Sequence, residues 1–391
     1  MPQFQTLPPL SLYIHLPWCV RKCPYCDFNS HPLRQELPEQ AYVAALLQDL
    51  ERDLPSVWGR TVQNIFIGGG TPSLFSSDAI DRLLSGIRAR LPLRPGAEIT
   101  LEANPGTAEQ ARFSGYREAG VNRLSIGVQS LSDTHLHRLG RIHTAHEACL
   151  AIEAARKAGF DNCNLDLMFA LPQQNLQQAM DDLRALIALQ PEHLSWYQLT
   201  LEPNTLFHAS PPQLPDDDQR TEMLLAGEDL LHRHGYARYE VSAWSQPDSQ
   251  CRHNLNYWQF GDYLGIGAGA HAKISDADQQ RIRRTSKQRH PTEYLQQAGT
   301  AHSILEQHDL SDADIVFEFA LNRLRLKQPF TTTEFERVSG LSRKHLDIPL
   351  AAAVQQELLI RDNEQIRHTD RGWMFLNDLI ERFLPQQHHA G

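Results

Sequence analysis

Three cysteines stand close together near the start of this 391-residue chain. Cys19, Cys23 and Cys26 form a C-x3-C-x2-C pattern within the stretch YIHLPWCVRKCPYCDFNS. Thiolates are soft ligands that suit zinc or an iron–sulfur cluster. Structural zinc sites and [4Fe–4S] clusters ordinarily take four protein ligands. Three cysteines on one loop therefore leave one position open, and an open iron of a cluster could chelate the amino and carboxylate groups of an amino acid.

Two other interpretations fit the same spacing. A zinc ion could be completed by a distant ligand, for which Cys251 or His253 is available. The three cysteines could also be structural and bind no metal. A disulfide framework is disfavoured, because the remaining cysteines are scattered and the N-terminus has no pattern of a secretion signal. Clustered cysteines in a cytoplasmic chain, which is the expected location, favour metal binding or catalysis.

Composition limits the class of protein. The formal net charge is −10, with 41% apolar and 21% charged residues. An acidic chain is not expected to be a dedicated nucleic-acid binder. The longest apolar runs fall well short of the roughly 20 residues that a membrane span needs. We expect a soluble globular protein with one large and one smaller domain.

Strand-like and helical stretches alternate through the first two thirds of the chain, which favours parallel βα units. Polar groups follow successive strands at their carboxyl ends, as a site on a β/α barrel requires. These are the cysteine loop, the glycines from 68 to 70 with Thr71, and then Glu102, Gln129 and Asp166. We therefore predict an α/β fold, a partial or open (β/α)6 barrel. Its strands are expected at 11–16, 64–69, 98–103, 123–129, 162–169 and 193–200, with helices at 38–54, 77–91, 107–119, 145–158 and 176–189.

The pattern changes after about residue 270. Helical stretches at 312–326, 332–338 and 343–357 are followed by two short strand-like pieces, and another helix begins near Asp370. This order predicts a small, α-rich, winged-helix-like domain. The expected organisation is a barrel domain over 1–270, a connecting segment over 271–310 and the C-terminal domain over 311–391.

Several motifs carry a family resemblance in their order along the chain. YIHLPWC is followed by GGGTPS at 68, LEANP at 101, NRLSIGVQS at 122, LGRIHT at 139 and NLDLMFALP at 164. Together they resemble the radical S-adenosylmethionine superfamily, and within it the anaerobic coproporphyrinogen III oxidase-like family. The match spans roughly the first 270 residues, and the C-terminal part resembles the accessory domain of that family.

The resemblance implies a set of cofactors and binding residues. Cys19, Cys23 and Cys26 would ligate one [4Fe–4S] cluster whose open iron binds S-adenosylmethionine. Tyr13 would lie beside the methionine end of that cofactor. The other implied cofactor-binding residues are Tyr25, Gly69, Gly70, Thr71, Glu102, Gln129, Arg141 and Asp166, of which Gln129, Arg141 and Asp166 match positions that contact a second cofactor molecule in the oxidase.

Two features depart from the oxidase pattern. The oxidase continues its motif with C-x-C, whereas here Cys26 is followed by Asp27 and Phe28, and only 18 residues precede Cys19. In addition, His253, Asn254, Tyr257 and Trp258 form an H-N-x-x-Y-W pattern that resembles the signature of the haem chaperone (HemW-type) branch. His253 is the candidate iron ligand of haem, since a neutral imidazole is a common axial ligand, and Cys251 is another possible ligand through its thiolate.

The leading hypothesis is a haem chaperone on a radical-SAM scaffold. It would bind haem and deliver it to acceptor proteins such as membrane-bound respiratory enzymes. The alternative is a radical-SAM oxidoreductase acting on coproporphyrinogen III or another substrate. A third hypothesis, a zinc or DNA-binding protein using the winged-helix-like end, is opposed by the acidic net charge.

Overall fold

The stretch RLSIGVQ forms strand β6 (Arg123–Gln129), and all seven of its residues are buried in the computed structural model, which describes residues 1–385 without the side chains at 107 and 108. Leu124, Ile126 and Val128 pack in the main hydrophobic core, whereas Arg123 and Gln129 line an interior cavity. Successive side chains of a strand point to opposite faces. One face of the sheet therefore packs under helices, and the other encloses a polar interior.

Strand β6 is part of a twelve-stranded sheet in the order β14-β13-β12-β11-β1-β4-β5-β6-β7-β8-β10-β9. The seven strands from β11 to β8 in this order are parallel, and strands at both ends are antiparallel. The two outermost strands do not pair with each other, so the barrel is open. The strands are β1 (Leu10–Leu16), β4 (Val62–Gly69), β5 (Leu93–Ala103), β7 (Cys163–Phe169), β8 (His193–Gln198), β9 (Ala237–Arg238), β10 (Ala243–Ser245), β11 (Asp262–Ile266), β12 (His271–Asp276), β13 (Arg281–Lys287) and β14 (Ile304–Asp309).

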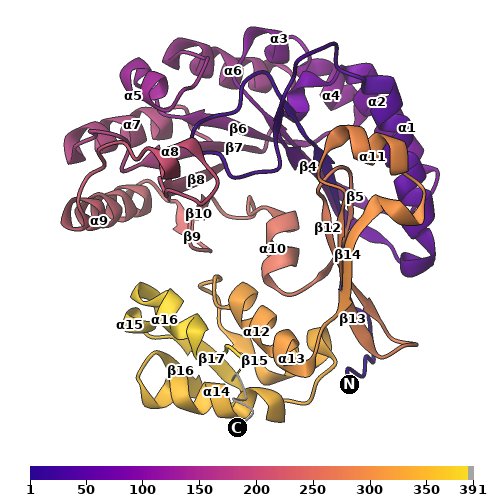
Figure 1. The fold of residues 1–391 in the computed structure, drawn as a ribbon. Coiled ribbons are helices and arrows are strands. Elements are labelled where there is room, and N and C mark those ends of the chain that lie inside the picture. Colours follow the sequence, from indigo (N-terminus) through magenta and orange to yellow (C-terminus); the bar gives the residue numbers. More distant parts are fainter. Residues whose placement is uncertain (386–391) are drawn as a thin grey trace.

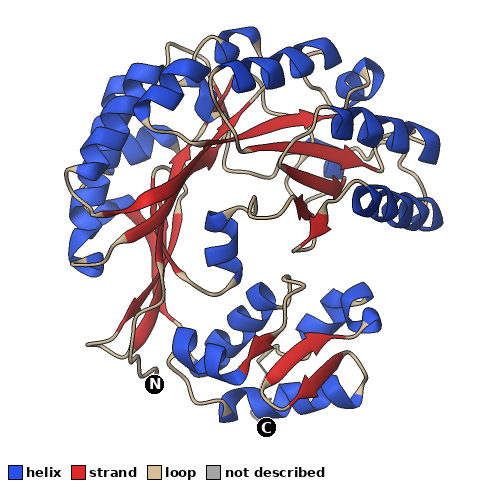
Figure 2. Ribbon diagram, turned by 180° about the vertical axis from the view of Figure 1, so that it is seen from behind, coloured by secondary structure: helices blue, strands red, loops and turns tan. Residues whose placement is uncertain are grey.

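Helices cover the convex outer face of the curved sheet (Figure 1). One helix, α10 (Arg252–Trp258), lies instead on the concave side, where Figure 2 shows it enclosed by the arc of strands. The other helices of this part of the chain are α1 (Glu39–Asp53), α2 (Ser77–Arg88), α3 (Thr107–Gln110), α4 (Phe113–Ala119), α5 (Asp133–Arg138), α6 (Ala145–Lys157), α7 (Leu176–Ala188), α8 (Leu206–Ala209), α9 (Asp217–Arg233) and α11 (Pro291–Gln297).

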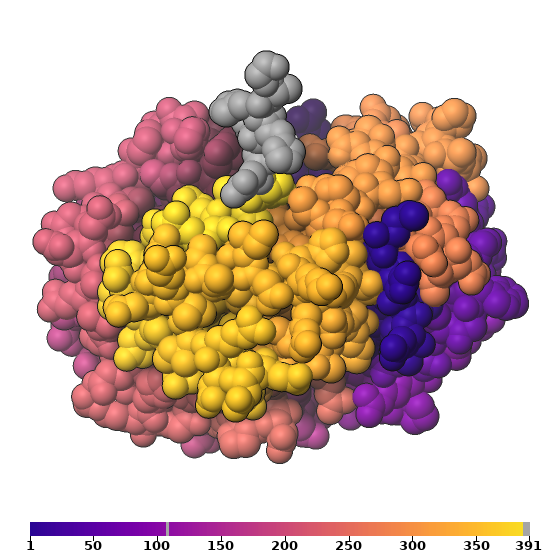
Figure 3. Space-filling view, turned by 90° about the horizontal axis from the view of Figure 1, so that it is seen from below, coloured from indigo at the N-terminus to yellow at the C-terminus, as the bar shows by residue number. Residues whose placement is uncertain are grey.

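The C-terminal part has a hydrophobic core of its own. Its helices are α12 (Asp312–Arg323), α13 (Thr332–Ser339), α14 (Lys344–Gln355), α15 (Asp370–Met374) and α16 (Leu376–Glu381), and its sheet has the order β15 (Phe330–Thr331), β17 (Gln365–His368), β16 (Leu359–Asp362). Figure 3 shows the N-terminal residues lying beside this part, where the backbone N–H of Gln3 donates to the carbonyl of Gly340 at 2.6 Å.

The predicted fold class is confirmed: an open α/β barrel is followed by a smaller C-terminal domain that is rich in helices. All six predicted strands are present. The segment expected as a connection has a regular structure, because strands β12, β13 and β14 extend the main sheet beyond β11. The domain boundaries themselves stay a prediction.

Candidate functional site

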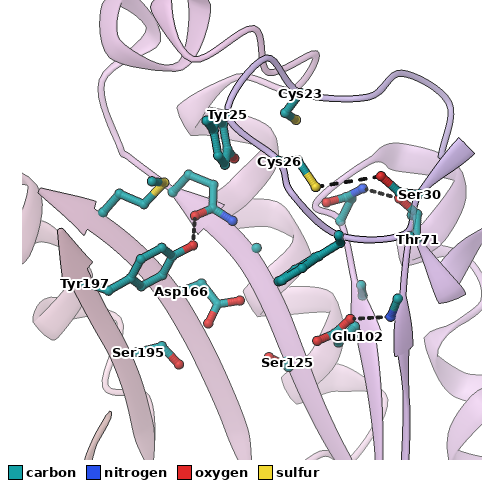
Figure 4. A pocket seen from close by; sticks show the side chains of 18 of the residues that line it. Cys23, Tyr25, Cys26, Ser30, Thr71, Glu102, Ser125, Asp166, Ser195 and Tyr197 are labelled. Carbon is teal, nitrogen blue, oxygen red and sulfur yellow. Dashed lines mark hydrogen bonds between the residues drawn. The ribbon is translucent and has the colours of Figure 1, made fainter. Parts of the chain in front are cut away.

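The three clustered cysteines lie on the loop that follows β1. The short strand β2 (Trp18–Cys19) pairs with β3 (His31–Pro32), and the backbone N–H of Cys26 donates to the carbonyl of Cys23 at 3.2 Å. These bonds fold the loop over the sheet, so that Cys19, Cys23 and Cys26 line one cavity of about 400 Å³. Figure 4 shows Cys23 and Cys26 at the edge of this first cavity.

The thiols of this loop are free, as are the other three cysteines. Burial raises the pKa of Cys19 and that of Cys26, so both thiols hold their protons at neutral pH in the metal-free chain. The Cys26 sulfur lies 3.7 Å from the hydroxyl oxygen of Ser30. Because metals bind the thiolate, loading a metal on this loop would release protons.

The donor set fits a cluster better than a single zinc ion. Within residues 1–385, no three His, Cys, Asp or Glu side chains are close enough to hold one metal ion. Cys251 does not line the first cavity, and its sulfur lies 3.8 Å from a carboxyl oxygen of Glu98. A cubane takes its cysteine ligands at separate corners, so three sulfurs spread around one cavity suit it.

The first cavity gathers most of the predicted site residues. Besides the three cysteines these are Tyr25, Gly69, Gly70, Thr71, Glu102, Gln129, Arg141 and Asp166. They come from β4, β5, β6 and β7 and from the loops that follow β1, β4 and α5. The carboxyl ends of the strands and these loops meet at the same edge of the sheet. This convergence is what parallel strands produce at their carboxyl ends.

Two carboxyl groups face this cavity from β5 and β7 (Figure 4). Glu102 accepts a hydrogen bond from the backbone N–H of Gly69 at 3.1 Å, and Asp166 accepts one from the Asn164 amide at 2.8 Å. Burial, with a smaller contribution from Asp166, raises the pKa of Glu102 to about 8, and burial also raises the pKa of Asp166. A cationic ligand in the cavity would favour the ionised form of both groups.

Arg141 connects the cysteine loop to the sheet. Its Nη2 donates to Asn104 Oδ1 at 2.7 Å and to the carbonyl of Gly127 at 2.9 Å, while Nη1 lies 3.6 Å from the sulfur of Cys23. The Asn104 amide in turn donates to the hydroxyl of Thr71 at 3.0 Å. These polar contacts join three predicted site residues into one network.

Gln129 ends strand β6 with a positive φ of 68°. Its side-chain oxygen accepts a hydrogen bond from the Tyr197 hydroxyl at 2.8 Å, as drawn in Figure 4. Tyr25, on the cysteine loop, packs beside Phe207 with ring centroids 6.3 Å apart. The cysteine loop therefore contacts α8, where the backbone N–H of Phe207 also donates to the carbonyl of Pro24 at 2.9 Å.

Gly69 and Gly70, two of the three glycines in the motif at the end of β4, are needed for close packing. A side chain on Gly69, whose φ is 120°, would place Cβ 2.8 Å from the His15 ring. One on Gly70 would place Cβ 2.6 Å from the carbonyl oxygen of Trp18. The end of β4 can therefore lie directly against the start of the cysteine loop only because both residues lack Cβ.

Tyr13 and His253 line a second, larger cavity of about 1210 Å³. The Tyr13 hydroxyl lies 2.9 Å from His15 Nδ1. The rings of Tyr13, Phe66 and His253 contact one another, with centroid distances of 6.3 Å from Tyr13 to Phe66, 5.1 Å from Phe66 to His253 and 6.2 Å from Tyr13 to His253. His253 Nδ1 lies 3.0 Å from Asn64 Oδ1, and no hydrogen bond joins its Nε2 to any residue in the described part of the chain. Burial lowers the pKa of His253 to about 3, so the imidazole is neutral at physiological pH.

The two cavities adjoin each other. Phe28, Glu102 and Asn254 contribute to the walls of both. Since Asn254 lies on α10 and Phe28 on the cysteine loop, the H-N-x-x-Y-W motif and the cysteine motif meet at the same internal wall. A ligand in the second cavity would lie next to the cofactor site without occupying it.

Sequence reasoning missed the inner residues of the first cavity. Arg123, Asn164 and His193 line it deep inside the barrel. The His193 Nδ1–H donates to Asn164 Oδ1 at 2.7 Å, and its Nε2 accepts from the Tyr239 hydroxyl at 2.8 Å. The signal for them was the alternation within each strand, where polar side chains at every second position face inward.

Comparisons with known proteins agree with this arrangement. Residues 13–186 match the Radical SAM superfamily, and residues 310–375 match the HemN C-terminal domain. The solved structure of coproporphyrinogen III oxidase (HemN) from Escherichia coli shares the fold, with a TM-score of 0.81 and 24% identity, over 96% of this chain and 90% of that one. The open barrel and its cysteine loop thus define a protein of the radical SAM superfamily.

Two curated relatives narrow this class. The "Heme chaperone HemW" of Escherichia coli (strain K12) is 52% identical over 380 residues, which is 97% of this chain and 99% of the relative. The protein of the same name from Haemophilus influenzae is 49% identical over 97% of this chain and 99% of its own length. The chain belongs to the HemW family, and the predicted resemblance is confirmed.

None of the helices within residues 1–385 is both long enough and apolar enough to cross a bilayer.

Proposed function

We propose that this chain is a cytoplasmic haem chaperone, which binds haem beside a [4Fe–4S] cluster and S-adenosylmethionine and delivers it to acceptor haemoproteins. The observation that carries this proposal is the position of α10. Its His253 lines a cavity that adjoins the cysteine loop, and its Nε2 has no hydrogen-bond partner within residues 1–385. Relatives at 52% and 49% identity that bear the name of haem chaperones support it.

In this proposal Cys19, Cys23 and Cys26 are the three protein ligands of the cluster. When bound, the cluster supplies an open iron for the amino-acid end of S-adenosylmethionine and an electron when reduced. The chain's own contribution is to hold the loop. The contact of Arg141 Nη1 with the Cys23 sulfur at 3.6 Å and the pairing of β2 with β3 hold the loop over the sheet.

The polar wall of the first cavity would hold the cofactor. Glu102 and Asp166 can accept hydrogen bonds from a cationic ligand, and Gln129 and Thr71 add neutral groups. Tyr25 would cover the cofactor from the loop, while Tyr13 lies on the side of the second cavity. One molecule of about the size of S-adenosylmethionine suits the volume of about 400 Å³.

Haem would lie on the concave side of the sheet, with His253 as an iron ligand. Its Nδ1 is occupied by Asn64, so Nε2 is the nitrogen available to iron. The recipient would be a haemoprotein such as a respiratory enzyme at the membrane. The further cysteine of the oxidase pattern is absent, because Cys26 is followed by Asp27 and Phe28, and this argues against decarboxylation of coproporphyrinogen III.

A binding experiment tests this function. Anaerobically reconstituted protein is titrated with haem and analysed for iron, sulfide and haem. The expected result is about four irons with sulfide in the cluster and one haem per chain. Zinc without sulfide at the cysteine loop would refute the cluster. The absence of saturable haem binding would refute the proposed haem chaperone.

A further inference from the structure

The second cavity has the size and the walls of a site for a large planar ligand. Its volume of about 1210 Å³ exceeds the roughly 300–1,000 Å³ of ordinary ligand pockets. Tyr257 lies 4.8 Å from Trp258 and 5.1 Å from Tyr263 between ring centroids. Phe28 reaches the cavity from the cysteine loop and is 59% exposed. Aromatic side chains on several sides suit a flat macrocycle.

The cavity has two chemically different ends. At the end formed by β1, β4 and α10, His253 packs against Phe66 and Tyr13. At the end formed by β12 and β13, His271 begins β12 opposite Ser286, and Arg289 follows β13. The first end is aromatic and carries the proposed iron ligand, whereas the second is polar.

The polar end carries cationic and hydrogen-bonding groups that no described residue satisfies. Arg284 is paired with Glu318 at 2.6 Å, but the guanidinium of Arg289 has no carboxylate within salt-bridge distance in residues 1–385. The His271 ring makes no hydrogen bond within the same residues. Burial, with contributions from the charges of Arg284 and Arg289, lowers the pKa of His271. The backbone N–H of Gly269 donates to the carbonyl of Gln288 at 2.8 Å, which brings the segments of His271 and Arg289 side by side, and both side chains line the cavity.

Three more charged side chains line this cavity. Lys22, on the cysteine loop, donates to the carbonyl of Phe28 at 3.0 Å and has no acidic partner in the described residues. The carboxyl groups of Asp27 and Glu306 also face the cavity, and neither forms an ion pair there. Of the other imidazoles that line the cavity, His15 has both ring nitrogens within 2.9 Å of protein groups, and His31 Nε2 lies 3.3 Å from Asn29 Oδ1. His308 makes no side-chain hydrogen bond within residues 1–385.

From these observations we infer that the second cavity is the haem site, in which Arg289 and His271 hold a propionate at the end opposite His253. The inference rests on the proposed function and adds to it the place and orientation of the ligand. Arg289 supplies the charge for a carboxylate, and the free imidazole of His271 donates a second hydrogen bond. With the propionates at this end, the ring would extend past Tyr257 and bring the iron toward His253.

The test compares haem with its dimethyl ester, which lacks both carboxylates. Wild-type protein should bind haem more tightly than the ester. In Arg289→Gln the affinity for haem should fall about fivefold, as expected for a partly exposed ion pair, while the affinity for the ester stays unchanged. His271→Ala should likewise bind haem less tightly than the wild type and bind the ester equally well. Arg94→Gln, at an exposed position, should have the wild-type affinity for both ligands.

The outcomes separate this inference from the function on which it rests. If wild-type protein fails to bind haem, the proposed function is wrong. If it binds haem but Arg289→Gln binds it as the wild type does, or loses both ligands equally, the propionate site is wrong and the chaperone proposal stands. Near-ultraviolet circular dichroism of each variant establishes that its fold is intact.

Discussion

His253 Nδ1 lies 3.0 Å from Asn64 Oδ1, which joins helix α10 to strand β4 across the concave side of the barrel. Because the amide oxygen only accepts, Nδ1 carries the proton and Nε2 keeps its lone pair. The imidazole is thereby held in the tautomer that an iron ligand needs. Asn64 is buried, so this orientation does not depend on solvent.

Replacing His253 by Ala should shift the Soret band of bound haem or reduce haem loading, since the proposed ligand is lost. Asn64→Ala should have a smaller effect in the same direction. It removes the hydrogen bond that holds the proton on Nδ1 of His253, but the imidazole ligand itself remains. Absorption spectra of the haem complexes measure both. Wild-type spectra and loading in the His253 variant would remove the ligand assignment and leave the chaperone proposal intact.

Replacing any one of Cys19, Cys23 and Cys26 by Ala should abolish the oxygen-sensitive cluster, because each substitution removes one of three thiolates. Iron and sulfide analysis of anaerobically reconstituted protein should find about four irons in the wild type and almost none in these variants. Cys149→Ala is the matched control, since Cys149 lies on α6 away from the loop. A cluster that survives the loss of Cys23 would contradict the ligand set.

Glu102 should make stability depend on pH in the ligand-free protein. The unfolded chain releases this proton near the ordinary pKa of 4.5, and the folded chain holds it until about 8. The folded state therefore binds more protons between these values, and stability contributed by this group falls as pH rises from 4.5 to 8.

Glu102→Gln should remove that slope, which is at most about 1.4 kcal/mol per pH unit. Urea unfolding between pH 5 and pH 9 measures it. The variant should gain stability relative to the wild type as pH rises, with Glu118→Gln at an exposed position as the control. Parallel curves for wild type and Glu102→Gln would show that this carboxyl group is not held protonated.

Trp258→Ala should weaken haem binding by roughly 1–3 kcal/mol if the ring contacts the porphyrin. The side chain also packs under Arg325, whose guanidinium carbon lies 4.5 Å from the ring centroid, so some loss of folding stability is expected as well. Haem titration and thermal unfolding separate the two effects. Trp58→Ala, at a position 81% exposed, is the control, and equal haem affinity in both variants would place the porphyrin elsewhere.

The sheet and the first cavity followed from the sequence because their signals are local. Each predicted strand is a short apolar run, and its last residues carry the polar groups that parallel strands bring to one edge. The spacing of the cysteine motif predicted three candidate metal ligands on one loop, and the family resemblance implied that they hold a [4Fe–4S] cluster. Glu102 and Asp166 could therefore be placed at one site from their positions at strand ends.

The second cavity could not be predicted in the same way. It depends on α10 turning into the concave side and on β12 to β14 extending the sheet, which are contacts between residues far apart in the sequence. His271 and Arg289 have no motif around them. The position of Arg123 was not predicted for a different reason. Whether its side chain points into the cavity depends on which face of β6 packs against the core.

The central claim is that the chain carries haem rather than converting a porphyrinogen. Haem-loaded, cluster-containing protein is mixed with an apo-haemoprotein, and the haem spectrum of the acceptor is followed after separation of the two. In parallel, the reduced protein is given S-adenosylmethionine and coproporphyrinogen III, and decarboxylated product is measured. The account predicts transfer of haem to the acceptor and no decarboxylation. Turnover of the porphyrinogen by a wild-type protein that binds no haem would contradict it and establish the oxidoreductase instead.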